Sequence, residues 1–395
     1  MALLHIDQPG AAPHSYSGPA WLALGFRPFY LLGAAFAALG IPLWLAIYYG
    51  RLPHTGLGLD WHMHEMVFGF VVAIVIGFMY TAGRNWTGLW TPRGPWLACI
   101  AGVWLAGRVA MLLPPSLVSA AVDAAFLPLA AWPMYRVLVR SGNARNMVLV
   151  VVLGLLTAAN LAFHAGRLEL AALSPVRAVY AAIILIVIIE SIIGGRVIPN
   201  FTANAVPGVK PVPRPLLEKA AMLFTVLAGL AWMLALPAVV AAPLAFGAAL
   251  AQGARLALWH PWRTLTRPIL WILHVSYAWI PLGMIMLGLS EMGLVAPSAA
   301  VHLLAVGALG GLIVGMITRT ALGHTGRPLA AGRADCAMYA LMQVAVVARL
   351  AAALGSWQRD ALLLTAGACW TLTFLMYLVV YAPRLLAPRI DGREG

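Results

Sequence analysis

Residues 61–88 read WHMHEMVFGFVVAIVIGFMYTAGRNWTG, a long apolar run with ionisable side chains at its start. A helix that crosses a membrane needs about 20 apolar residues, and this run is long enough. His62, His64 and Glu65 stand at the edge of the run. Ionisable groups at that depth are costly in lipid, so they usually face the protein interior and mark a site. The stretch therefore predicts a membrane helix with a functional site at one end.

A second run, later in the chain, repeats the pattern of the first. Five identities occur at one constant offset of 238 residues, and they indicate two related helices with a histidine at the same height. The matched pairs are His64 and His302, Gly69 and Gly307, Gly77 and Gly315, Thr87 and Thr325, and Gly88 and Gly326.

The composition is that of a membrane protein. Apolar residues make up 63% of the chain and charged residues 9%, and the mean hydropathy is +0.90. A soluble domain carries far more charge than this. The basic residues lie between apolar runs, which is the pattern of the positive-inside rule, so we expect lipid and no nucleic acid as a partner. Cys99, Cys336 and Cys369 lie far apart in apolar runs, so we interpret them as core residues.

Twelve runs are apolar and long enough to be membrane spans, and they predict an all-α polytopic protein. They cover residues 29–49, 62–82, 95–113, 117–138, 146–164, 176–195, 217–236, 239–257, 268–288, 299–320, 334–354 and 361–382. The domain prediction is a tail over 1–28, a twelve-helix membrane domain over 29–382 and a second tail over 383–395. The longest predicted loop is the Pro-rich segment at about 196–216.

The basic residues also predict the orientation. Most Arg and Lys residues follow even-numbered spans, and the C-terminal tail adds three more arginines. Both termini should therefore be cytoplasmic.

This orientation places four histidines near the outer face: His62, His64, His164 and His302. Neutral imidazole is a common metal ligand and a good axial ligand for haem. His64 and His302, at equal depth on two helices, would suit one porphyrin between them. His62 lies about 200° around the helix from His64, so it should face another site with His164. Glu65 is a candidate second-shell group or proton donor, although a carboxylate favoured by the helix dipole explains it equally well.

Two further ionisable residues lie nearer the inner face. His274 and Glu190 have similar depth on spans nine and six, respectively. Glu190 is a candidate proton carrier and His274 a candidate ligand for a second metal, while a structural hydrogen bond between helices is the alternative.

Four arginines lie in polar, glycine-containing segments at the inner mouth: Arg84, Arg196, Arg319 and Arg327. A guanidinium suits carboxylates such as haem propionates, so these residues are candidate cofactor clamps. Phospholipid headgroups are the alternative partners.

Several motifs together resemble the NnrS family over nearly the whole chain. They are His62-Met63-His64-Glu65-Met66 with Gly69 and Phe70, Asn85-Trp86-Thr87-Gly88, Gly195-Arg196-Val197-Ile198-Pro199, Leu273-His274 and the run from Arg319 to Pro328. The resemblance implies a bacterial inner-membrane protein with twelve spans that contains haem, expected to be b-type, and copper. It also implies a role in the response to nitric oxide and nitrosative stress, often beside denitrification. One position departs from the family pattern, because Asn200-Phe201 follows Pro199 where an aromatic pair is expected.

The architecture is also distantly similar to the catalytic subunit of haem-copper oxidases, in which histidines on spans two and ten bind the low-spin haem. However, the copper-binding histidines that those enzymes carry on spans six and seven are missing here: span six has Glu190 instead.

The leading hypothesis is thus a haem-copper protein that binds or reduces nitric oxide, with electrons from quinol or an unknown donor. A membrane transporter and a non-catalytic sensor or sink for haem or nitric oxide are the alternatives. A homo-oligomer is compatible with the sequence.

Overall fold

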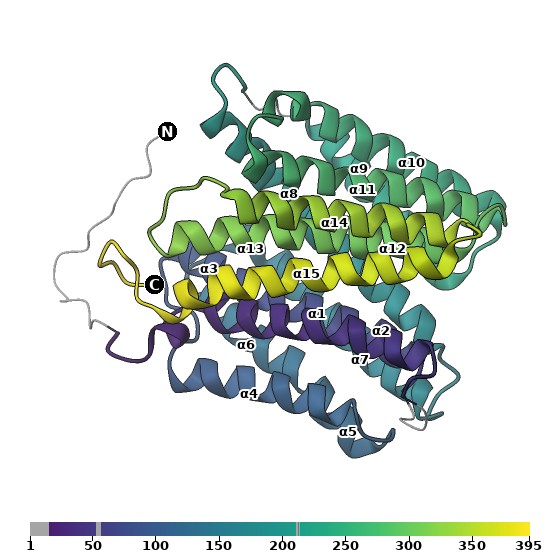
Figure 1. The fold of residues 1–395 in the computed structure, drawn as a ribbon, viewed down its shortest axis with the longest axis horizontal. Coiled ribbons are helices and arrows are strands. Elements are labelled where there is room, and N and C mark those ends of the chain that lie inside the picture. The colour runs from purple at the N-terminus through teal and green to yellow at the C-terminus, as the bar shows by residue number, and fades with distance from the viewer. Residues whose placement is uncertain (1–15, 53–56, 211, 213) are drawn as a thin grey trace.

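The protein is a bundle of long helices that run roughly along one axis (Figure 1). The computed structural model describes residues 16–52, 57–210, 212 and 214–395, and every regular element among them is a helix. In chain order these are η1 (Ala20–Leu22), α1 (Phe26–Tyr48), α2 (Leu59–His64), η2 (Glu65–Val71), α3 (Val72–Thr87), α4 (Pro95–Ala110), α5 (Leu117–Ala124), α6 (Phe126–Arg140), η3 (Ala144–Asn146), α7 (Met147–Arg167), α8 (Pro175–Ala205), α9 (Pro215–Leu234), α10 (Ala238–Ala257), η4 (Pro261–Thr264), α11 (Pro268–Glu291), α12 (Pro297–His302), η5 (Leu303–Gly310), α13 (Gly311–His324), α14 (Arg333–Ala353) and α15 (Arg359–Leu386).

Within the described residues, eleven helices are long and apolar enough to cross a membrane. Each of these eleven helices overlaps one predicted span, and most of the helix ends lie within a few residues of the predicted bounds. The predicted span 95–113 is the exception, because its helix α4 has only 16 residues. At 1.5 Å per residue α4 is about 24 Å long, which is shorter than the ~30 Å apolar core of a bilayer. The twelve-span prediction is therefore confirmed for eleven spans.

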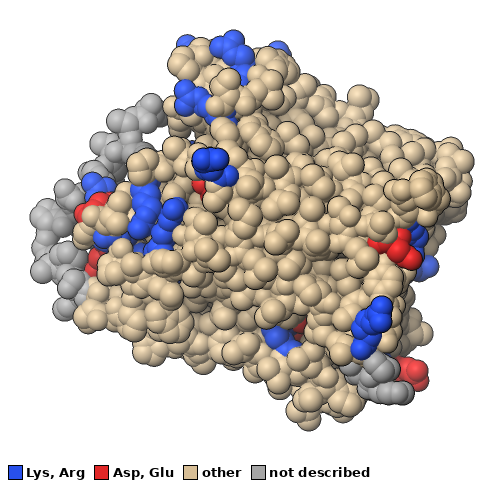
Figure 2. Space-filling model, in the orientation of Figure 1, with Lys and Arg blue, Asp and Glu red and all other residues tan. Residues whose placement is uncertain are grey.

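The outside of the bundle is as apolar as a lipid environment requires. Leu250 lies inside α10 and Val379 in the C-terminal half of α15, and each is 77% exposed. The face in Figure 2 shows a broad belt with few charged side chains, while Lys and Arg gather at the end where the chain termini lie. The protein is thus a multi-pass membrane protein.

The two ends of the described chain meet at one end of the bundle (Figure 1). The backbone N–H of Tyr16 donates a hydrogen bond to Glu394 (2.8 Å), and the buried Arg27 donates to the carbonyl of Leu385 (2.7 Å). Both ends of the described chain therefore lie at the same end of the bundle. Which side of the membrane this end faces stays a prediction, and residues 1–15 of the predicted tail lie outside the described residues.

The prediction of a loop at about 196–216 is wrong for the first half of that segment. Helix α8 continues through Pro199 to Ala205, so Arg196 lies within a helix. A proline breaks a helix in water, but membrane helices tolerate it because neighbouring groups compensate for the lost backbone hydrogen bond.

Among the eleven helices, the span formed by α2, η2 and α3 is the most enclosed: 89% of an 18-residue apolar stretch within it is buried. A π-helical segment, η2, begins directly after His64, and a second one, η5, begins directly after His302. These segments occupy equivalent positions in the two runs that share the 238-residue offset. π-Helical turns are rare and occur frequently at functional sites, so their recurrence supports the internal repeat.

Candidate metal and cofactor sites

Two histidines and an aspartate meet inside the bundle between α2, α5 and α7. Oδ2 of Asp123 lies 2.8 Å from Nε2 of His164 and 3.2 Å from Nε2 of His64. Nε2 of His64 also lies 2.8 Å from Oδ1 of Asn160, whose amide nitrogen donates to Asp123 (2.9 Å). His64, Asp123 and His164 are buried, and their ligand atoms all lie within 4.8 Å of one another. Imidazole and carboxylate in this geometry could hold a metal ion.

A second carboxylate and an arginine complete this group. Nδ1 of His64 lies 2.9 Å from Oε1 of Glu65, and Arg108 on α4 donates hydrogen bonds to both Glu65 and Asp123. We call these six buried residues the polar cluster: His64, Glu65, Arg108, Asp123, Asn160 and His164.

The charges of the polar cluster do not balance when both of its imidazoles are neutral. Its two carboxylates face a single guanidinium, and buried charge is costly in a bilayer unless it is balanced. Either a proton on an imidazole or a bound metal cation would neutralise the remaining carboxylate. The cluster could therefore balance its charge with either of these two.

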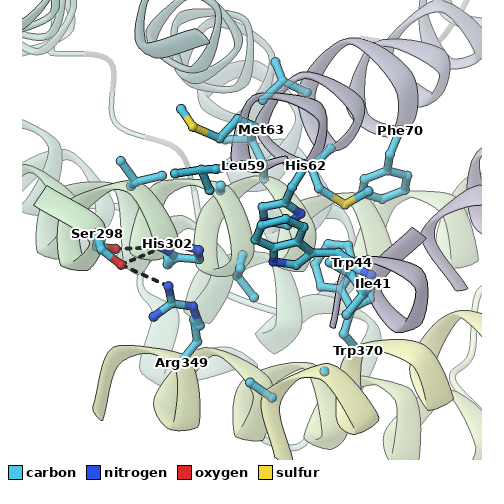
Figure 3. Close-up of a pocket in the computed structure, with 18 of the residues that line it drawn as sticks. Ile41, Trp44, Leu59, His62, Met63, Phe70, Ser298, His302, Arg349 and Trp370 are labelled. Carbon is cyan, nitrogen blue, oxygen red and sulfur yellow. Dashed lines mark hydrogen bonds between the residues drawn. The ribbon is translucent and has the colours of Figure 1, made fainter. Parts of the chain in front are cut away.

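A separate pocket of about 380 Å³ lies at the end of the bundle opposite the termini. Its volume is within the range of about 300–1,000 Å³ that is typical of ligand sites. His62 and His302 come from different helices and line this pocket, and Trp44, Phe70 and Trp370 contribute aromatic walls (Figure 3). We call it the histidine pocket.

Each of the two imidazoles has a nitrogen that is available for a ligand. Nδ1 of His62 is buried and has no hydrogen-bond partner, while its ring stacks on Trp44 with centroids 4.7 Å apart. Nδ1 of His302 lies 2.8 Å from the carbonyl oxygen of Ser298, which leaves Nε2 without a protein partner among the described residues. Metal-binding histidines usually donate the other N–H to such a carbonyl. The pocket walls and these two nitrogens fit a flat, apolar, metal-containing cofactor.

The structure pairs the four outer histidines differently from the sequence-based expectation. His302 shares its pocket with His62, whereas His64 and His164 belong to the polar cluster, with ring centroids 5.3 Å apart. The sequence correctly separated His62 from His64, since residues two apart on a helix point to different sides. The expected partners were wrong, because the neighbouring helices and not the repeat decide what each imidazole meets.

The inner candidates lie apart from both sites. His274 is buried, with Nε2 2.9 Å from the hydroxyl of Thr202, and its Nδ1 has no partner. Glu190 lines a second pocket of about 80 Å³, where Tyr30 is the only other residue with a polar side chain. Oε2 of Glu190 is buried and makes no hydrogen bond.

The four candidate arginine clamps line neither of the two pockets. Arg84 donates to the carbonyl of Gly88, Arg196 donates to Asn146 (2.7 Å), Arg319 lies over the Phe201 ring (3.9 Å), and Arg327 contacts the carbonyl of Thr325 (3.4 Å). These contacts are all with other protein groups, so the structure gives no support for the four arginines as cofactor clamps.

Sequence reasoning missed four charged residues that the structure brings to the sites. Arg108 and Asp123 belong to the polar cluster, and Arg349 and Arg359 line the histidine pocket. The first three lie inside predicted spans, where a charge is rare and usually functional, and this was the available signal for them.

Comparison with known proteins agrees with the sequence motifs. The family model described as NnrS protein matches residues 20–389, which include every helix and both sites described above. No curated protein matches the chain. Because the match covers nearly all of its 395 residues, this protein belongs to the NnrS family.

Proposed function

We propose that this protein is a bacterial inner-membrane haem-copper protein that binds or reduces nitric oxide and thereby protects the cell against nitrosative stress. Membership of the NnrS family fits a membrane protein of the nitric oxide response and suggests bound metal. One observation carries the proposal: His62 and His302 come from different helices and line one largely apolar pocket, and among the described residues neither Nδ1 of His62 nor Nε2 of His302 has a hydrogen-bond partner.

In this proposal, His62 and His302 hold the haem in the histidine pocket. The aromatic walls supply flat apolar surface, which a porphyrin needs. The Ser298 carbonyl would keep Nδ1 of His302 protonated, so that Nε2 presents its lone pair to the iron. When bound, the haem would supply the iron that binds nitric oxide.

Copper is assigned to the polar cluster. His64, Asp123 and His164 offer the imidazole and carboxylate atoms, and a bound cation would balance the charge of the cluster. Imidazole suits copper. Arg108 and Glu65 would orient the ligands through their hydrogen bonds with Asp123 and His64, respectively.

Reduction of nitric oxide also needs protons and electrons. Glu65 and Glu190 are the proposed proton carriers, because both are buried carboxyl groups with an oxygen that makes no hydrogen bond. Quinol or an unknown partner is the proposed electron donor.

Purified protein tests the cofactor assignment directly. We expect a Soret band and bound copper. His62→Ala and His302→Ala should lose haem, while His274→Ala, which removes a buried histidine outside the histidine pocket, should keep it. Absence of a Soret band, or equal haem in all three variants, would contradict the proposal.

A second measurement separates an enzyme from a binder. Nitrous oxide formed from nitric oxide and a reductant indicates a reductase, and a spectral shift without product indicates a sensor or sink. Substrate uptake into vesicles by metal-free protein would favour a transporter instead.

A further inference from the structure

The histidine pocket contains an unpaired positive charge. Arg349 on α14 lines the pocket, and within the described part of the chain it makes one hydrogen bond, to the hydroxyl of Ser298 (2.9 Å). Among the described residues, no carboxylate lies within 4.0 Å of its guanidinium. The guanidinium presents five N–H donors, and most of them therefore have no acceptor.

A second guanidinium faces the same pocket from the start of α15. Arg359 donates to the hydroxyl of Tyr48 (2.8 Å), and Asp360 is the one carboxylate within 4.0 Å of it among the described residues. Asp360 also accepts a hydrogen bond from Tyr49 (3.2 Å), so its charge is shared. This end of the pocket has more positive than negative charge.

The rest of the pocket does not compensate for that charge. The other titratable residues that line the pocket are His62, His302, Tyr48 and Tyr180, and neither imidazole nor neutral phenol groups provide a negative charge. Most of the remaining wall is aliphatic or aromatic. An unpaired cation beside apolar surface is costly, and a bound anion would remove the cost.

The position of Arg349 defines what kind of anion fits. Ser298 lies 2.9 Å from Arg349 through its hydroxyl and 2.8 Å from His302 through its carbonyl, so one residue fixes both groups (Figure 3). If the apolar part of a ligand contacted the His302 ring, an acidic substituent on that ligand would lie beside the guanidinium of Arg349. Arginine binds carboxylates through two parallel hydrogen bonds, and such pairs are strong and directional.

We propose that Arg349, with Arg359 beside it, forms a carboxylate-binding subsite at the rim of the histidine pocket. Its ligand is an apolar molecule that bears a carboxylate. Two sources share this chemistry: the propionates of the proposed haem, and the headgroup of a lipid-soluble carboxylic acid. The first source rests on the proposed function, and the second does not.

Calorimetry on haem-free protein in detergent tests the subsite independently of haem. Benzoate and benzamide have the same shape and differ in charge. We expect wild-type protein to bind benzoate more tightly than benzamide. Arg349→Gln should weaken benzoate binding about tenfold, equivalent to about 1.4 kcal/mol, and leave benzamide unchanged. Arg263→Gln, on an exposed residue outside the pocket, is the matched control.

Haem and its dimethyl ester then identify the source of the carboxylate. If the propionates occupy the subsite, wild-type protein should prefer haem to the ester, and Arg349→Gln should abolish this preference. A preference for benzoate without a preference for haem supports the subsite and assigns it to another lipid-soluble acid. Equal binding of benzoate and benzamide, no binding of either, or an Arg349→Gln variant that retains the wild-type benzoate affinity would overturn the proposal.

Discussion

Oδ2 of Asp123 lies 2.8 Å from Nε2 of His164, although 41 residues separate them in the chain. Their helices, α5 and α7, bring the pair next to His64 on α2. This arrangement makes Asp123 the centre of the polar cluster, and the first two predictions follow from it.

Replacing Asp123 by Asn should destabilise the protein and remove its copper. The amide keeps the shape but not the charge, so Arg108 loses one of its two carboxylate partners inside the membrane. Breaking a buried ion pair costs about 3–5 kcal/mol. Thermal unfolding in detergent and metal analysis measure the two effects. Asp360→Asn, on a side chain that is 70% exposed, should change neither. Unchanged stability and copper in Asp123→Asn would contradict the role of the cluster.

His64→Ala and His302→Ala should have opposite effects on the two metals. The His64 ring belongs to the polar cluster and the His302 ring to the histidine pocket. We therefore expect His64→Ala to lose copper and keep haem, and His302→Ala to lose haem and keep copper. Optical spectra and metal analysis of the same preparations give both quantities. Loss of haem in both His64→Ala and His302→Ala would instead support the histidine pairing expected from the repeat.

Glu190→Gln should lower nitric oxide turnover without lowering stability. Oε2 of Glu190 makes no hydrogen bond, and the pocket around it is almost entirely apolar, so a neutral amide removes no buried ion pair. If the carboxyl group carries protons, the rate should fall because an amide cannot take up and release a proton. The melting temperature and the rate of nitrous oxide formation report the two effects. Glu291→Gln, a variant outside both pockets, is the control, and equal rates in the two variants would argue against proton transfer by Glu190.

Gly195→Ala should destabilise the bundle although it adds only a methyl group. A Cβ at this position would overlap the guanidinium of Arg255, which binds Glu218 at 2.5 Å and Tyr277 at 2.8 Å. Overpacking of this kind costs about 1–3 kcal/mol. At Gly154, in the middle of α7, an added Cβ would meet no atom within 4 Å. Gly154→Ala should therefore stabilise the protein by up to about 1 kcal/mol, and thermal unfolding of both variants tests the contrast.

The helices could be predicted because the signal for them is local. A run of apolar residues forms a helix in a bilayer whatever its neighbours are, since each backbone N–H and C=O must find its partner within the same segment. This is why residues 61–88 predict a span and why eleven predicted spans were confirmed. The same locality explains the errors: α4 is apolar but short, and Pro199 suggested a helix end that the protein environment does not impose.

The sequence by itself determined that His62 and His64 belong to different sites, because residues two apart in an α-helix point to different sides. It also marked most of the residues that matter, since a titratable side chain within an apolar run needs a partner. Only the tertiary structure decided who those partners are: Asp123 for His64, and the Ser298 carbonyl for His302. Contacts between helices depend on how the bundle packs, and no pattern along the chain specifies that.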